Sequence, residues 1–181
     1  MYLPIKNFRS NFIIIMIFGI VLGACSKDEK QFVEVKLDLE VNLPAGLNSL
    51  ETHYFVYKNV PNFYTQSLLS NGISKERVDK ITGFRARLSG SSGTANFELF
   101  RRISVFAVEK DNPSNRLEMF YLDDIPFGIT TEIELLTSIS NLKSVMEADD
   151  LYTLEFQIEF KTFVPFDQRI KFDYSYAIFF D

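Results

Sequence analysis

The sequence holds few of the side chains that enzymes use for nucleophilic or metal-dependent chemistry. Its 181 residues include one cysteine, Cys25, and one histidine, His53. A single cysteine excludes a disulfide within the chain and any zinc site that needs several cysteines. A serine–histidine pair would have to use His53, yet no Gly-x-Ser-x-Gly turn is present to expose a serine. We interpret His53 as an ordinary residue of a strand and expect no catalytic residue, no metal site and no cofactor.

Paired carboxylates occur at Asp123-Asp124 and at Asp149-Asp150. Neighbouring residues of a strand point to opposite faces, so adjacent acids are poorly placed to act as the two facing carboxyl groups of a glycosidase. No segment has the Asp-x-Asp-x-Asp-Gly spacing of a calcium loop. A looser calcium site built from Glu147 with Asp149 and Asp150 stays open as an alternative, as does a carboxylate-dependent hydrolase.

The basic residues are few and are concentrated in one region. Lys and Arg number 19 against 24 Asp and Glu, and the net charge of −5 argues against a nucleic-acid partner. The glycine-rich residues 89–93 lack the Gly-Lys-Ser/Thr of a phosphate-binding loop and are typical of a hairpin. Four arginines lie close together in the sequence, and we interpret them as a solvated face, with an acidic partner or a lipid headgroup as the alternative. They are Arg85, Arg87, Arg101 and Arg102.

Cys25 stands at the end of an apolar run that follows two basic residues, Lys6 and Arg9. The run covers residues 12–22, and as a helix it would span about 16 Å, which is about half the core of a bilayer. It is therefore too short for a comfortable transmembrane helix but has the right length for the core of a signal peptide. The position of the cysteine after this run indicates its role.

Residues 22–25, Leu-Gly-Ala-Cys, resemble the lipobox of bacterial lipoproteins. The resemblance implies that residues 1–24 are a signal peptide removed by signal peptidase II. It also implies that the Cys25 thiol carries a diacylglycerol thioether and that its freed amine is acylated, for example with palmitate. Each buried CH₂ contributes about 0.8 kcal/mol, so several acyl chains would hold the protein permanently at a membrane. An ordinary signal peptide, or a buried strand with a core cysteine, is the alternative.

The residues after the cysteine resemble the lipoprotein export signal of the Bacteroidota, in which a lysine is followed by two acids. Lys27, Asp28 and Glu29 carry this resemblance. It implies a lipoprotein of the outer membrane on the cell-surface face, with the periplasmic face as the alternative. Because a strand pattern begins at Phe32, residues 25–31 form the tether, which reaches roughly 20 Å when extended.

Alternating apolar and polar residues predict a mainly β domain over residues 32–181. The alternation is clearest in residues 33–43, 154–160 and 170–178, as in strands with one face on a core and one in water. Gly, Pro and Asn turn signals separate the remaining segments, so we predict a single antiparallel β-sandwich of eight or nine strands with one short helix. The weaker strand segments are residues 52–57, 83–88, 95–100, 103–109, 116–122 and 131–136.

The short helix is predicted over residues 140–148, where Ser140 can cap it and Leu142, Val145 and Met146 share a face. A further helical turn is expected around residues 74–80. Nineteen Phe and eight Tyr suit a sandwich whose inner faces are filled by aromatic rings. Most of the aromatic content therefore needs no functional explanation.

One predicted loop brings aromatic and amide side chains together. Its candidate binding residues are Asn59, Asn62, Phe63, Tyr64 and Gln66. Aromatic rings beside amides suit stacking on sugars or a hot spot for a protein partner. The structural alternative is that Phe63 plugs the end of the sandwich.

These patterns lead us to expect a non-catalytic lipoprotein that serves as an accessory or interaction subunit of an outer-membrane complex. The short tether favours this function, because it holds the domain among membrane neighbours. The alternative is a glycan- or ligand-binding surface module for nutrient capture. The expected partners are the membrane, through the acyl chains, and an outer-membrane protein or a glycan.

Overall fold

A computed structural model describes residues 31–91, 95–125, 128 and 131–181. The residues that resemble a lipobox and an export signal, with Cys25, Lys27, Asp28 and Glu29, lie outside the described residues. The part of the chain from Gln31 to Asp181 forms one unit. None of the helices described is both long enough and apolar enough to span a membrane.

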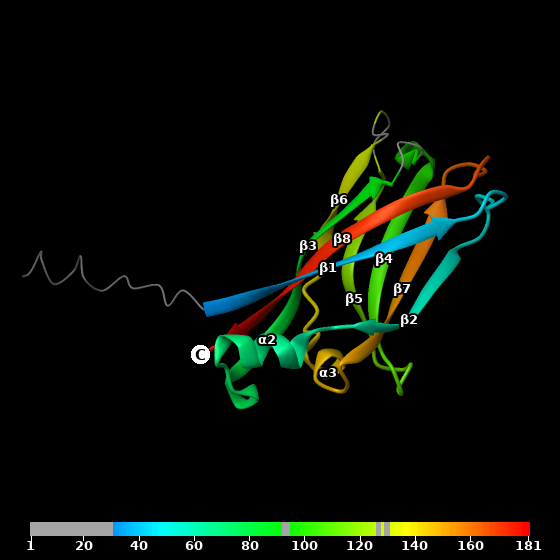
Figure 1. Cartoon of the computed structure of the whole chain (residues 1–181). Coiled ribbons are helices and arrows are strands. Elements are labelled where there is room, and N and C mark those ends of the chain that lie inside the picture. Colours follow the sequence, from blue (N-terminus) through cyan, green and yellow to red (C-terminus); the bar gives the residue numbers. More distant parts are fainter. Residues whose placement is uncertain (1–30, 92–94, 126–127, 129–130) are drawn as a thin grey trace, which may run out of the picture. The chain divides into compact units, whose positions relative to one another are not determined.

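The unit is built on eight antiparallel strands, as the alternation predicts, and its fold is mainly β (Figure 1). Their order across the sheet is β1-β8-β3-β6-β5-β4-β7-β2. The strands are β1 (Gln31–Leu43), β2 (His53–Pro61), β3 (Val78–Gly90), β4 (Phe100–Glu109), β5 (Arg116–Asp123), β6 (Glu132–Thr137), β7 (Leu151–Phe160) and β8 (Gln168–Phe180).

The sheet consists of two four-stranded halves, β1-β8-β3-β6 and β5-β4-β7-β2, and curls so that both halves face one core. Only two residue pairs join the halves, Phe120 with Thr137 and Tyr121 with Leu136. The short strand β6 makes this link, because its first four residues pair with β3 and its last two with β5. The arrangement is sandwich-like, but the two layers are continuous at one side.

Register explains which side chains enter the core. Strands β1 and β8 pair over thirteen residues without a shift, from Gln31 opposite Phe180 to Leu43 opposite Gln168. Every second residue of β8 from Ile170 to Ile178 is buried, as expected for period-two strands. The predicted inner faces of residues 33–43, 154–160 and 170–178 are thus confirmed.

Aromatic rings fill the space between the two halves. Phe172 on β8 stacks on Tyr174 with ring centroids 4.6 Å apart, and its ring meets Phe156 of β7 edge-on at 5.0 Å. Phe120 of β5 meets the same Phe172 at 6.2 Å. Such edge and offset contacts are the favourable geometries for aromatic pairs. The rings therefore hold together halves that share few backbone hydrogen bonds.

The helices differ from the prediction in number and extent. They are α2 (Tyr64–Asn71), the 3₁₀ turns η1 (Lys75–Arg77) and η2 (Phe97–Leu99), and α3 (Lys143–Met146). Helix α3 lies inside the predicted residues 140–148, but the side chain of Asn141, not Ser140, accepts from the Lys143 N–H at its start. Helix α2 was not predicted, because Phe63 stands at its N-cap and supplies no capping side chain.

Two tyrosine hydroxyls are paired inside this core. The Tyr152 and Tyr174 oxygens lie 2.6 Å apart, and both residues are almost fully buried. Burial raises the pKa of Tyr174 to about 12 and raises the pKa of Tyr152 well above its ordinary value. Desolvation is the main cause in both cases, because it disfavours the charged phenolate.

Alkaline pH is therefore expected to destabilise the domain. Tyrosines of the unfolded chain lose protons near pH 10, whereas the folded chain keeps the Tyr174 proton to about pH 12, so the free energy of unfolding falls across that interval. Urea unfolding from pH 8 to 11.5 should show a smaller fall for Tyr174→Phe than for the unchanged chain. Tyr54→Phe, at a side chain that is 58% exposed, is the control and should not alter the slope. Equal slopes for Tyr174→Phe and the unchanged chain would contradict this account.

Candidate functional site

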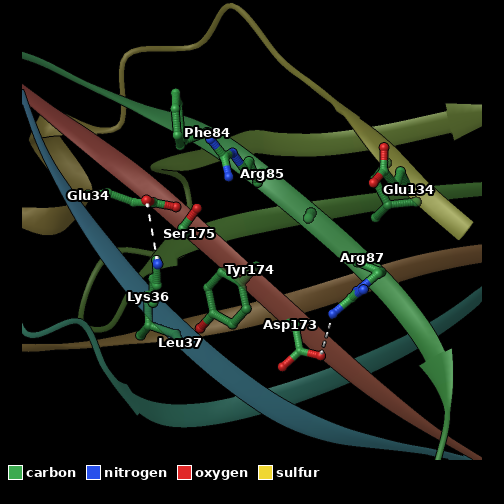
Figure 2. A pocket seen from close by; sticks show the side chains of 12 residues that line it. Glu34, Lys36, Leu37, Phe84, Arg85, Arg87, Glu134, Asp173, Tyr174 and Ser175 are labelled. Carbon is green, nitrogen blue, oxygen red and sulfur yellow. Dashed lines mark ion pairs between the residues drawn. The ribbon is translucent and has the colours of Figure 1, made fainter.

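An open groove of about 760 Å³ lies on the half of the sheet formed by β1, β8, β3 and β6 (Figure 2). Register builds its walls from outward-pointing residues. On β8, Ser175 lies between Lys36 and Arg85, and Asp173 pairs with Arg87 in the next row. The charged side chains that line it are Glu34, Lys36, Arg85, Arg87, Glu134 and Asp173.

Lys171 holds Asp173 at 2.6 Å beside the groove, but the other ion pairs there are loose. Arg87 lies 3.6 Å from a Glu132 oxygen and 4.0 Å from an Asp173 oxygen, and Lys36 lies 3.9 Å from Glu34. The Lys36 side chain is 78% exposed and that of Arg87 is 50% exposed. Exposed pairs of this kind contribute about 0–1 kcal/mol, so the side chains can exchange partners at small cost.

Two further groups in the groove have unused bonding capacity. Among the described residues, Arg85 has no ion-pair partner, and its guanidinium lies 4.9 Å above the ring of Phe84. The buried Ser175 hydroxyl has no hydrogen-bond partner within the described part of the chain. A buried hydroxyl left unpaired costs about 1–3 kcal/mol, which a bound group could recover.

A bulge in β3 shapes one end of the groove. The pairing with β8 shifts between Gly83 and Arg85, which leaves Phe84 without a partner on β8. The bulge comes directly after a point where β3 closely approaches β5. A Cβ on Gly83 would lie 2.7 Å from the Met119 carbonyl oxygen. Bulges commonly redirect side chains beside functional sites. Here the bulge places the Phe84 ring against Phe32 of β1.

One sequence signal points to this groove, namely the cluster of arginines. Arg85 and Arg87 do share the outer face of β3, as predicted, whereas Arg101 and Arg102 belong to β4. Arg102 is paired with Asp123 at 2.9 Å. The acidic residues of the groove lie on strands that are distant in sequence. Their pairing with the basic residues therefore follows from the strand order and cannot be read from the sequence alone.

The candidate binding residues at the end of β2 are only partly exposed. Asn62 and Tyr64 are buried, with 0% and 2% of their surface accessible, while Phe63 is 46% exposed. Asn59 and Gln66 are also exposed. Three of the five predicted residues are therefore available to a ligand without rearrangement.

Asn62 joins the start of α2 to the turn between α3 and β7. Its side-chain amide donates to the carbonyl oxygens of Met146 at 3.0 Å and Asp149 at 2.7 Å. Its side-chain oxygen accepts from the Tyr64 N–H, and the Tyr176 hydroxyl donates to its carbonyl oxygen at 2.6 Å. These bonds occupy both donors of the buried side-chain amide. They also supply a hydrogen-bond acceptor at the start of α2, so this helix needs no ordinary N-cap.

The acidic residues near α2 are engaged in structural contacts. Glu147 accepts a 2.6 Å hydrogen bond from the Tyr64 hydroxyl, and Asp150 accepts one of 2.7 Å from Thr65. Lys110 lies 3.0 Å from Asp149, and its hydrogen bond holds the pKa of that carboxyl below the usual value. Within the described ranges, no three His, Cys, Asp or Glu residues group in a way that could hold a metal ion.

Backbone strain marks the same segment. Asn59 and Phe63 have φ angles of 59° and 57°, in the left-handed region that glycine usually occupies. Among the described non-glycine residues, Asp124 alone shares this feature. A bulky side chain in this conformation costs free energy and is often found where a ligand binds.

The contacts of His53 are those of a structural residue. Its Nε2 lies 2.9 Å from the Asn48 carbonyl oxygen, and its ring centroid is 5.5 Å from that of Phe160. It begins β2, in agreement with the predicted strand.

Comparison with known proteins gives no functional information. No protein-family model and no curated protein matches the sequence. A solved structure titled Desmodium yellow mottle tymovirus is similar, with 9% sequence identity and a TM-score of 0.28, over 82% of this chain and 88% of that chain. Similarity this low carries no argument about function.

Loss of the Asn62 amide should unfold the corner around α2. We expect Asn62→Ala to lower the free energy of unfolding by about 2–3 kcal/mol, because one buried and one partly buried carbonyl oxygen lose their donor. Gln66→Ala, at an exposed helix residue, is the control and should change it by less than about 0.5 kcal/mol. Urea denaturation followed by circular dichroism measures both. An Asn62→Ala chain as stable as the control would show that these hydrogen bonds are not needed.

Proposed function

We propose that this protein is a lipid-anchored, non-catalytic subunit of an outer-membrane complex and that it binds its partner through the charged groove. The groove carries the proposal, because it exposes charged side chains of both signs and its cations Lys36 and Arg87 are held only by pairs of 3.6–4.0 Å. A partner can replace these weak pairs without leaving a charge buried and unpaired.

The resemblance of residues 22–25 to a lipobox supports the anchor. Acyl chains on Cys25 would confine the domain to a layer close to the bilayer, since five residues separate Cys25 from the start of β1. Confinement raises the effective concentration of a membrane partner, so a weak docking surface is sufficient. The Lys27, Asp28 and Glu29 export signal supports placement on the cell-surface face.

Removal of two groove cations should abolish partner capture. The double variant Lys36→Ala with Arg87→Ala removes two of the three cations that line the groove. In a pull-down of the tagged full-length protein from gently solubilised outer membranes, we expect the co-purified membrane protein to fall at least about tenfold, equivalent to 1.4 kcal/mol. Quantitative mass spectrometry of the eluate measures the loss.

The matched control is Arg101→Ala with Arg169→Ala, which removes two exposed cations outside the groove. Equal capture by the groove variant and this control would overturn the groove as the docking site. The intact mass of the purified protein tests the anchor separately, because acylation adds mass to a chain that begins at Cys25.

A second candidate function is ligand or glycan binding at Phe63. The specific observation is its half-exposed ring on a strained backbone, with Asn59 and Gln66 also exposed. Aromatic rings in such positions stack on the apolar faces of sugars, and the amides supply hydrogen bonds.

This alternative predicts that Phe63→Ala abolishes glycan binding and leaves the fold intact. Tyr64 is unsuitable for the test, because its buried ring supports the fold. Phe166→Ala, at an equally exposed phenylalanine, is the control. A glycan array with both variants distinguishes the outcomes. Binding that survives Phe63→Ala, or that is absent from the unchanged protein, would exclude this site.

A further inference from the structure

Three phenylalanine rings cluster where β1 begins and β8 ends. The Phe32 ring centroid lies 5.3 Å from Phe84 and 5.6 Å from Phe179. Phe32 and Phe179 are direct partners in the ladder between β1 and β8. Phe32 is 46% exposed, although it lies in a regular strand and its ring has aromatic neighbours on one side. The cluster is an apolar patch on the outer face, next to the groove of Figure 2.

One arginine flanks this aromatic patch. The Arg85 guanidinium lies 4.9 Å above the Phe84 ring. A side chain with an apolar stem and a cationic head suits the boundary between acyl chains and phosphate headgroups. Phenylalanine rings beside an arginine head therefore combine the two chemistries of a lipid surface.

The geometry points to a bilayer surface as the occupant of this patch: we infer that Phe32, Phe84 and Phe179 rest on the membrane with Arg85 at the headgroups. This inference rests on the proposed lipid anchor. Phe32 is seven residues from Cys25, and even a fully extended tether leaves it within roughly 25 Å of the anchored residue. The surface nearest to the patch is then the membrane itself.

A tethered patch does not have to bind the bilayer on its own. The anchor removes the cost of bringing the domain to the membrane, so one exposed ring and one guanidinium can decide its orientation. The excess of acidic residues opposes contact with anionic lipid elsewhere on the surface, which favours the arginine-flanked end. Docking would orient β1 and β8 so that their aromatic ends face the membrane and their opposite ends point away from it.

A single tryptophan can report this contact, because the chain contains none. Phe32→Trp places the probe in the patch, and Phe166→Trp places it at an equally exposed phenylalanine in the loop before β8, at the opposite end of that strand (Figure 1). The mature chain from Cys25 is coupled through its only thiol to maleimide lipid in phosphatidylethanolamine–phosphatidylglycerol vesicles. Dibrominated acyl chains quench tryptophan that reaches them.

We expect emission from Phe32→Trp to fall at least about twofold in brominated vesicles, because interfacial side chains reach about 5–10 Å into the boundary of the acyl chains. Emission from Phe166→Trp should not change. Adding Arg85→Glu to Phe32→Trp should weaken the quenching. Equal emission of Phe32→Trp in brominated and ordinary vesicles would overturn the inference, as would equal quenching of both probes.

Chemical coupling separates this test from the test of the anchor. If the native protein lacks acyl chains but the coupled protein is quenched, the patch binds lipid and the anchor proposal fails. If the native protein is acylated and the coupled protein is not quenched, the anchor stands and the docking inference fails. Circular dichroism of each variant confirms that the fold is retained.

Discussion

The contact of Phe172 with rings from the other half of the sheet is the interaction on which the structure depends. Within the described part of the chain, the halves share only two residue pairs, in the ladder between β5 and β6. Phe120 and Phe156 meet Phe172 across the interior, so the core, and not the hydrogen-bonded ladder, closes the domain. The groove and the aromatic patch lie on the outer face of the half whose inner face these rings fix.

The sequence was sufficient for the strands because residues 33–43 and 170–178 alternate with period two, and the side of each residue follows from that period. The strand order could not be predicted from the sequence, since the six residues of β6 that join the halves have the pattern of any short strand. The burial of Asn62 could not be predicted from the sequence for a related reason. Asn62 is polar and follows proline, yet its partners, Met146 and Asp149, lie more than eighty positions away.

The groove and the aromatic patch are two parts of one continuous surface along β1, β8 and β3. Register sets their order, because the Phe32–Phe179 pair lies at one end and the Lys36–Ser175 pair lies four residues further along β1. Phe84 and Arg85 belong to both, through the bulge after Gly83. A domain that rests on its aromatic end would present its charged groove sideways, toward a neighbour in the same membrane.

The pairing of β1 with β8 also constrains how the protein is made. β8 is the last of the described strands in sequence, yet it lies between β1 and β3 and completes the core beneath both. Closing contacts between residues so far apart in sequence is slow. A growing chain therefore has no complete sheet to form until residues 168–180 have been synthesised.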